Sequence, residues 1–214
     1  MAIAKRKKRF YDVEIPLIEK ETTLIGFDIE DIDKKFLKYD MTRLLRGKNV
    51  LMQFLVEVKD KKATARPYSL KILNTFLRRM MRKGTDYVED SFSCECNDAQ
   101  IRIKPFLITR KKVSRAVRKA LRNKCNEELL KYVEDTTIEE IFDSIVKNSL
   151  QKELSLKLKK IYPLSLCEIR VLKIEKELEP KTKKKVSKKE EEVKKAKEDS
   201  TEKSAEKIVE EIKE

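Results

Sequence analysis

A run of positive charge between Thr109 and Lys124 is the segment whose residue types best suit the binding of a ligand. Eight of its sixteen residues are Arg or Lys, and none is acidic. Its apolar residues recur at helical spacing, at Val113, Ala116, Val117, Ala120 and Leu121. Like charges four residues apart on a helix repel by about 0.2–0.5 kcal/mol per pair. We therefore expect a polyanion outside the chain to compensate for this charge.

Acid-free stretches extend beyond this segment. Ten basic residues and no acidic residue occur from Arg102 to Lys124, and six basic residues occur without an acid from Arg66 to Lys83. A helix face that only meets solvent usually carries both signs, because oppositely charged pairs four residues apart stabilise it. For both stretches we favour contact with nucleic acid over a merely solvated surface.

The candidate RNA-binding residues come from the basic N-terminus and from these two stretches. They are Lys5, Arg6, Lys7, Lys8, Arg9, Arg78, Arg79, Arg82, Lys83, Arg110, Lys111, Lys112, Arg115, Arg118, Lys119, Arg122 and Lys124. RNA is favoured over DNA because the cations are scattered, and because zinc-finger spacing and a basic region leading into leucine heptads are both missing. No aromatic ribonucleoprotein motif is present either. The contacts should therefore be with phosphates and sugars.

Two further groups carry metal-ligating side chains. One is an acidic cluster of Asp28, Glu30, Asp31 and Asp33. These carboxylates could hold Mg²⁺ near RNA, although a strand edge that faces solvent explains them better. Cys94 and Cys96 would share one face of a strand. Because the chain has no histidine, the commonest general base and zinc nitrogen ligand is missing. We predict buried, reduced thiols, no metal or other cofactor and no catalytic residues.

The overall composition agrees with a polyanionic partner. The 214-residue chain has a formal net charge of +14 and a pI near 9.5, which suits nucleic acid, an anionic membrane surface or an acidic protein. No run of eighteen apolar residues is present, and no apolar stretch follows the N-terminal cations as in a secretory signal. The four cysteines do not form a disulfide framework. We expect a cytosolic protein without a membrane partner.

Short strands and four helices should position these residues. Alternating apolar residues predict strands in 23–33, 49–60, 61–67, 86–96, 99–109 and 167–174, with an extended segment at 9–16. About six strands suggest an antiparallel β-barrel flanked by helices, an α+β fold. Helical spacing predicts helices in 69–84, from Thr109, in 137–147 and in 149–163. Their expected signals are caps at Ser69 and Thr109, a stop at Gly84, a capping box from Thr137 to Glu140 and a break at Pro163.

Charge also divides the chain into three parts. We predict a basic N-terminal arm at 1–12, a rRNA-binding domain of barrel and helices at 13–178, and a disordered or transiently helical tail at 179–214. The tail contains 12 Lys and 11 acidic residues, which leaves a net charge of +13 in residues 1–178. The charge excess therefore belongs to the folded part and its arm.

The order of several motifs resembles the archaeal and eukaryotic small-subunit ribosomal protein family S3Ae. The segments that carry this resemblance cover about residues 9–176 and read RFYDVEIP, LIGFDIEDID, GKNVLMQFLVEVKDKKA, LNTFLRRMMRKGTDYVED, IRIKPFLITRKKVSRAVRKALR and IYPLSLCEIRVLKI. Phe10 stands where the family often has Trp, and the segment after Tyr68 lacks the family's LTRD wording. The chain thus looks like a divergent archaeal member.

This resemblance implies a structural constituent of the small ribosomal subunit, without catalytic activity. It implies a β-barrel flanked by helices on the subunit platform, bound to small-subunit rRNA. Neighbouring platform proteins are implied as partners, with messenger RNA near its exit as a further candidate. Three alternatives stay open: an extra-ribosomal RNA- or DNA-binding regulator, a carboxylate-dependent nuclease, and a protein that binds membrane surfaces through the Arg110–Lys124 helix.

Overall fold

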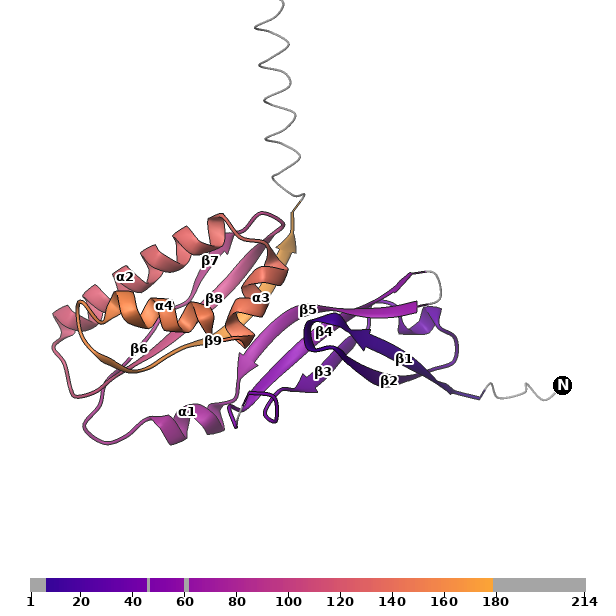
Figure 1. Ribbon diagram of the computed structural model, residues 1–214, viewed down its shortest axis with the longest axis horizontal. Coiled ribbons are helices and arrows are strands. Elements are labelled where there is room, and N and C mark those ends of the chain that lie inside the picture. Colours follow the sequence, from indigo (N-terminus) through magenta and orange to yellow (C-terminus); the bar gives the residue numbers. More distant parts are fainter. Residues whose placement is uncertain (1–6, 46, 60–61, 179–214) are drawn as a thin grey trace, which may run out of the picture. The chain divides into compact units, whose positions relative to one another are not determined.

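The computed structural model describes residues 7–45, 47–59 and 62–178 (Figure 1). The strands in these ranges are β1 (Arg9–Ile15), β2 (Lys20–Gly26), β3 (Phe36–Asp40), β4 (Val50–Lys59), β5 (Lys62–Ile72), β6 (Tyr87–Glu89), β7 (Phe92–Glu95), β8 (Ala99–Thr109) and β9 (Leu164–Glu177). The helices are α1 (Asn74–Met80), α2 (Arg115–Glu134), α3 (Ile138–Val146) and α4 (Ser149–Leu158), with short 3-10 turns η1 (Pro16–Ile18) and η2 (Glu30–Ile32). Residues 1–6 and the expected tail at 179–214 lie outside the described residues, so the three-part division stays a prediction.

The strands form one mixed β-sheet. Its main path runs β2-β1-β5-β9-β8-β6, while β4 pairs with β5 and β3, and β7 pairs with β8. The pair β1–β5 is parallel, through Val13 opposite Ala63 and Glu14 opposite Thr64. The remaining pairs in the described ranges are antiparallel.

The predicted closed antiparallel barrel of about six strands is therefore wrong, although the α+β class holds. The main path ends at β2 and β6, which do not pair with each other in the described part of the chain. The physical reason lies in two long strands, β5 and β8, of eleven residues each. Different stretches of each strand pair with different neighbours, so that the sheet branches instead of closing on itself.

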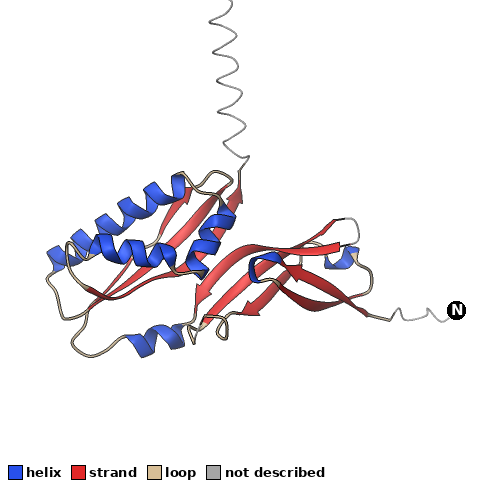
Figure 2. Cartoon of the chain, viewed as in Figure 1, coloured by secondary structure: helices blue, strands red, loops and turns tan. Residues whose placement is uncertain are grey.

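Three helices cover one face of the strands β6–β9 (Figure 2). The longest, α2, buries one residue in every four at Leu121, Cys125, Leu129 and Val133. Its side-chain cap is Ser114, whose hydroxyl accepts a hydrogen bond from the Val117 N–H. The predicted cap at Thr109 is wrong, because Thr109 ends β8. The predicted apolar stripe is also shifted, since Ala116 and Ala120 are exposed.

The predicted helix at 69–84 is only partly correct. Residues up to Ile72 continue β5, and α1 covers only Asn74–Met80. Ser69 does not cap the helix; its hydroxyl donates to Gln53 Oε1 on the neighbouring strand at 2.9 Å. The capping box of α3 is confirmed, with Glu140 Oε2 accepting the Thr137 N–H at 3.2 Å.

Pro105 creates an irregularity in the sheet that matters for the surface. Because proline has no N–H, it cannot donate to the ladder of a central strand and is confined to bulges or edges. Lys104 lies opposite Val171 and Pro105 lies opposite Ile169, so that Arg170 is the extra residue of a β-bulge in β9. The bulge frees Arg170 from the regular strand pairing.

Candidate nucleic-acid interface

A hydrogen-bonded contact between Asp86 and Thr109 brings the two acid-free stretches together. The Thr109 N–H donates to the Asp86 carbonyl at 2.9 Å, and the Asp86 N–H donates to Thr109 Oγ1 at 3.1 Å. Asp86 Oδ2 also accepts the Val113 N–H at 2.9 Å. Thr109 itself is fully buried. We call these contacts the Asp86–Thr109 junction; they fix the loop 110–112 beside the segment that leads into β6.

A tight turn on the other side of the junction presents two more cations. The Thr85 N–H and hydroxyl both donate to the Arg82 carbonyl, at 3.3 and 2.7 Å. Gly84 adopts a φ of +84°, a backbone conformation that residues with a Cβ rarely adopt. Gly84 is thus a turn residue and not the last residue of a helix. The turn leaves the side chains of Arg82 and Lys83 exposed.

Eight exposed cations from these segments have no acidic partner. Among the described residues, no carboxylate forms an ion pair with Arg78, Arg82, Lys83, Arg110, Lys111, Lys112, Arg115 or Lys119. We call this set the unpaired cations. They come from α1, from the two loops that flank the junction, and from the first turns of α2. Their arrangement can bind a polyanion without first breaking an internal ion pair.

Other predicted site residues of α1 and α2 are already engaged within the protein. Arg79 donates to Asn49 Oδ1 at 2.6 Å, and its guanidinium lies 5.7 Å from the Phe76 ring centroid. Arg122 pairs with Asp90 at 3.9 Å. Arg118 is half-buried, and its Nε is enclosed without a hydrogen-bond partner among the described residues. Arg79 and Arg122 therefore contact groups of the folded domain and Arg118 is partly enclosed by it, so that these three side chains are less available to a ligand than the unpaired cations.

Lys124 is partly neutralised by its own helix. Its Nζ lies 3.3 Å from a carboxylate oxygen of Glu127 and 3.1 Å from one of Glu128. Hydrogen bonds from Lys157 and Lys124 lower the pKa of Glu128 to about 2, and hydrogen bonds with Glu128 and Glu127 raise the pKa of Lys124. Both groups stay charged at neutral pH, so that Lys124 offers less net charge to a ligand than the unpaired cations do.

The N-terminal candidates lie elsewhere in the sheet. Lys7, Lys8 and Arg9 are exposed at the start of β1, and Lys8 Nζ lies 5.5 Å from the Phe27 ring centroid. β1 pairs with β2 and β5, and none of the unpaired cations belongs to these strands. Lys5 and Arg6 lie outside the described residues. The structure therefore joins the two internal stretches with each other but not with the arm.

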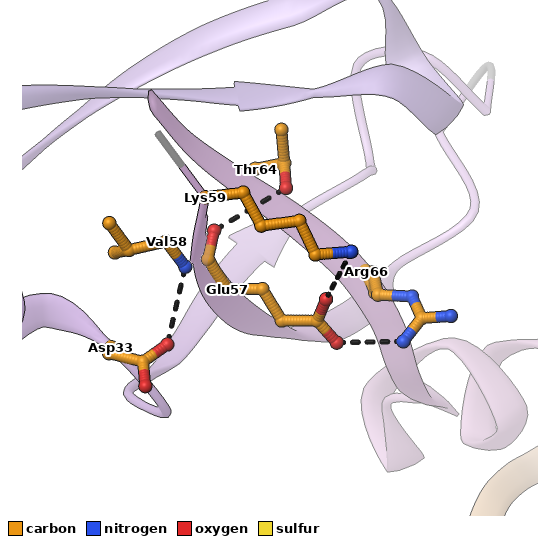
Figure 3. Close-up of polar contacts among 6 residues, drawn as sticks. All are labelled: Asp33, Glu57, Val58, Lys59, Thr64 and Arg66. Atoms are coloured by element: carbon orange, nitrogen blue, oxygen red, sulfur yellow. Dashed lines mark hydrogen bonds and ion pairs between the residues drawn. The ribbon is translucent and has the colours of Figure 1, made fainter. Parts of the chain in front are cut away.

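Some cations of the acid-free stretches find acids on neighbouring strands. Arg66 Nη1 lies 2.7 Å from Glu57 Oε1, and Lys59 Nζ lies 3.5 Å from the other carboxylate oxygen of Glu57. Figure 3 shows both contacts. The hydrogen bond with Glu57 raises the pKa of Arg66. Arg102 likewise pairs with Glu175 at 2.7 Å. A stretch without acids in the sequence is therefore not always free of acids in space.

The acidic cluster contributes to the turns around η2. Asp33 Oδ1 accepts the Val58 N–H at 3.2 Å (Figure 3), and Asp31 Oδ2 accepts the Asp28 N–H at 3.2 Å. In the described ranges, no three His, Cys, Asp or Glu side chains gather in an arrangement that could hold a metal ion. Two of these carboxylates thus act as acceptors for backbone N–H groups.

Comparison with known proteins agrees with the resemblance seen in the motifs. The sequence matches the model of the ribosomal S3Ae family over residues 5–178. The chain belongs to this family. The protein named small ribosomal subunit protein eS1 of Methanothermobacter thermautotrophicus is 26% identical over 172 residues, which cover 77% of this chain and 88% of that protein.

Two further relatives carry the same printed name. The one from Haloarcula marismortui is 26% identical over 184 residues, covering 81% of this chain and 86% of that protein. The one from Halorubrum lacusprofundi is 35% identical over 101 residues, covering 47% of each chain. The predicted membership of the S3Ae family is thus confirmed. None of the four α-helices in the described ranges has the length and apolar character that a membrane crossing requires.

Sequence reasoning missed the residues that position the unpaired cations in this member of the S3Ae family. Neither Asp86 nor Gly84 was recognised as holding a basic loop, and Thr109 was assigned to the helix that follows. The signal for Thr109 was weak: a polar residue at the end of the apolar run from Phe106 to Ile108, directly before three cations. Such a residue is a candidate for a buried hydroxyl that fixes the next loop.

We predict that Thr109→Val lowers the free energy of unfolding by about 1–3 kcal/mol, because it removes the hydroxyl that accepts from the Asp86 N–H and hydrogen-bonds to the carbonyls of Asp86 and Lys111. Urea denaturation of the full chain measures this change. The exposed Thr23→Val is the matched control and should stay within about 0.5 kcal/mol of the parent protein. Equal stability of the two variants would contradict a positioning role for the Thr109 hydroxyl.

The cysteines give a second prediction. Cys94 and Cys125 are buried, and burial raises the pKa of each thiol from 9.0 to about 12. The folded protein is fully stable with respect to these thiols below about pH 9, where they are protonated in both the folded and the unfolded state. As the pH rises from 9 towards 12, the unfolded chain loses these protons more readily, and the folded state is destabilised. At pH 8 both thiols should react with iodoacetamide far more slowly in the native protein than in urea, since the thiolate is scarce. Mass spectrometry resolves each site, and native alkylation at the unfolded rate would contradict the prediction.

Proposed function

We propose that this member of the S3Ae family is a structural constituent of the small ribosomal subunit and binds small-subunit rRNA through its phosphate groups. The observation that carries the proposal is the set of unpaired cations on either side of the Asp86–Thr109 junction. Its relatives are named as proteins of the small ribosomal subunit, which is the particle in which such a surface would be used.

The chemistry of these side chains suits phosphate. Four of the eight are arginines, whose planar guanidinium groups can hold two phosphate oxygens at once. The Ser114-capped start of α2 adds a helix end that favours nearby negative charge. Each neutralised phosphate releases counterions, so that eight contacts would give a slope of about −7 for the logarithm of affinity against the logarithm of salt.

The finer expectations belong to the same proposal. We place the protein on the platform of the small subunit in the cytoplasm, beside neighbouring ribosomal proteins and near the messenger RNA exit. In this role it positions RNA and other proteins and performs no reaction. An extra-ribosomal RNA- or DNA-binding regulator is the alternative, and it predicts a protein that sediments as a free species at moderate salt.

The proposal predicts a specific effect of charge reversal. Changing Arg110, Lys111 and Lys112 together to Glu should weaken binding to transcribed small-subunit rRNA by at least about tenfold and reduce the salt slope by about 3. The variant should also fail to sediment with small subunits. Filter binding at several salt concentrations and gradient sedimentation measure both effects.

A matched control reverses three exposed lysines elsewhere, Lys20, Lys35 and Lys38, which lie in β2, before β3 and in β3. This control variant has the same change in net charge, but its residues lie outside the proposed site. It should therefore lose less RNA affinity than the loop variant, and its salt slope should fall by less. If the two variants lose the same affinity for RNA and the same salt slope, only the net charge of the protein matters for binding. The unpaired cations would then not be the RNA-binding site.

A further inference from the structure

A cleft of about 220 Å³ opens beside the unpaired cations, between α1, β6 and β9. Arg78, one of these cations, forms part of its wall together with Met81 and Tyr87. Tyr87 directly follows Asp86 of the junction and lies opposite Ile108 on β8, so that it is close to both the turn at Arg82 and the loop 110–112. The cleft is therefore next to the groups that we expect to hold phosphates.

Tyr87 is held firmly and yet remains accessible. Its ring stacks on Phe106, with 5.8 Å between the ring centroids and 24° between the ring planes. Tyr87 is nevertheless 55% exposed, so that much of its ring is open to a ligand. A fixed and exposed ring among cations is the arrangement on which nucleic-acid bases stack.

The polar side of the cleft has groups that can recognise the edge of a base. Arg170, the extra residue of the β-bulge in β9, forms an ion pair with Glu89 and donates from Nη2 to Asn74 Oδ1 at 3.2 Å. This contact ties the three side chains to one another, although they come from three separate segments. Amide, carboxylate and guanidinium groups are the side-chain groups that hydrogen-bond to base edges.

We infer that this cleft holds an unpaired RNA base, which stacks on Tyr87 while the flanking phosphates lie against Arg78, Arg82 and the loop 110–112. The inference rests on the proposed function and adds a direct base contact to it. RNA recognition commonly targets bases that are not in a duplex, because these can leave the helix and stack on aromatic side chains. The lack of a ribonucleoprotein motif had led us to expect backbone contacts alone.

Another exposed aromatic surface provides the contrast. Phe10 is 72% exposed and lies opposite Ile25 in the β1–β2 hairpin. The next pairs outward on that face carry acids, with Glu14 directly opposite Glu21. Phe10 thus has acids on its own face of the hairpin and belongs to strands that carry none of the unpaired cations, which makes it a useful control for Tyr87.

The test compares two RNA probes on the full chain. One probe is a short oligoadenylate, and the other is a perfectly paired RNA duplex with the same number of phosphates. Tyr87→Leu should weaken oligoadenylate binding by about 5- to 150-fold, the effect of losing one stacked base, and should leave duplex binding within about twofold. Tyr87→Phe keeps the ring and should bind both probes like the parent protein, as should Phe10→Leu.

A second measurement uses the unmodified protein and so does not depend on whether a variant folds. Oligoadenylate with a single 2-aminopurine should change its fluorescence on binding, because this base analogue leaves the adenine stack of the free strand and stacks on Tyr87 instead. Unchanged fluorescence, or equal oligoadenylate binding by Tyr87→Leu and the parent, overturns the inference and leaves the cleft for a protein side chain. If the parent protein binds neither probe, the proposed RNA-binding function fails together with the base-binding inference. If it binds the duplex but Tyr87→Leu has no effect on oligoadenylate, only the base-binding inference fails.

Discussion

Repulsion among like charges is the constraint on which the surface of this protein depends. Three acids of the neighbouring segments already form contacts within the fold. Asp86 accepts the Val113 N–H, Asp90 accepts a hydrogen bond from Asn126 and pairs with Arg122, and Glu128 pairs with two lysines. The carboxylates therefore hold the segments in place, while the cations of the two loops and of the start of α2 remain available to a partner.

The hydrophobic core is large enough to tolerate this repulsion. Each leucine that α2 buries contributes roughly 1.5–3 kcal/mol, whereas each pair of like charges on a helix costs only about 0.2–0.5 kcal/mol. The helix can thus present cations on its exposed face as long as Leu121, Leu129 and their neighbours stay packed against the sheet and α4. A fold of this kind can carry an unbalanced surface before its polyanion arrives.

Local patterns in the sequence were sufficient to predict several elements but not how they pair. The alternation from Val50 to Val58 predicted β4, and Thr137 with Glu140 predicted the start of α3. The prediction of a barrel was wrong because alternating apolar residues identify a strand but do not show which strands it pairs with. The segment 69–72 was assigned to a helix because Leu70 and Leu73 also fit helical spacing, whereas its pairing with β4 and β9 decides the outcome.

The candidate site shows the same division between local and long-range information. The cations themselves could be read from the sequence, but their availability depends on acids brought from other strands, as Glu57 is to Arg66. The cleft beside Tyr87 could not be predicted, since Arg170 lies 81 residues from Glu89 and 96 residues from Asn74 in the chain. Arg170, the extra residue of a β-bulge in β9, contacts both Glu89 and Asn74, and no local pattern in the sequence indicates these contacts.

A high-resolution map of small ribosomal subunits that contain this protein tests the central claim most directly. RNA phosphates should lie within ion-pair distance of the side chains of Arg110, Lys111 and Lys112, and of Arg82 or Lys83 on the other side of the Asp86–Thr109 junction. If these side chains instead faced open solvent or the carboxylates of a neighbouring protein, the claim that an RNA backbone balances their charge would be contradicted.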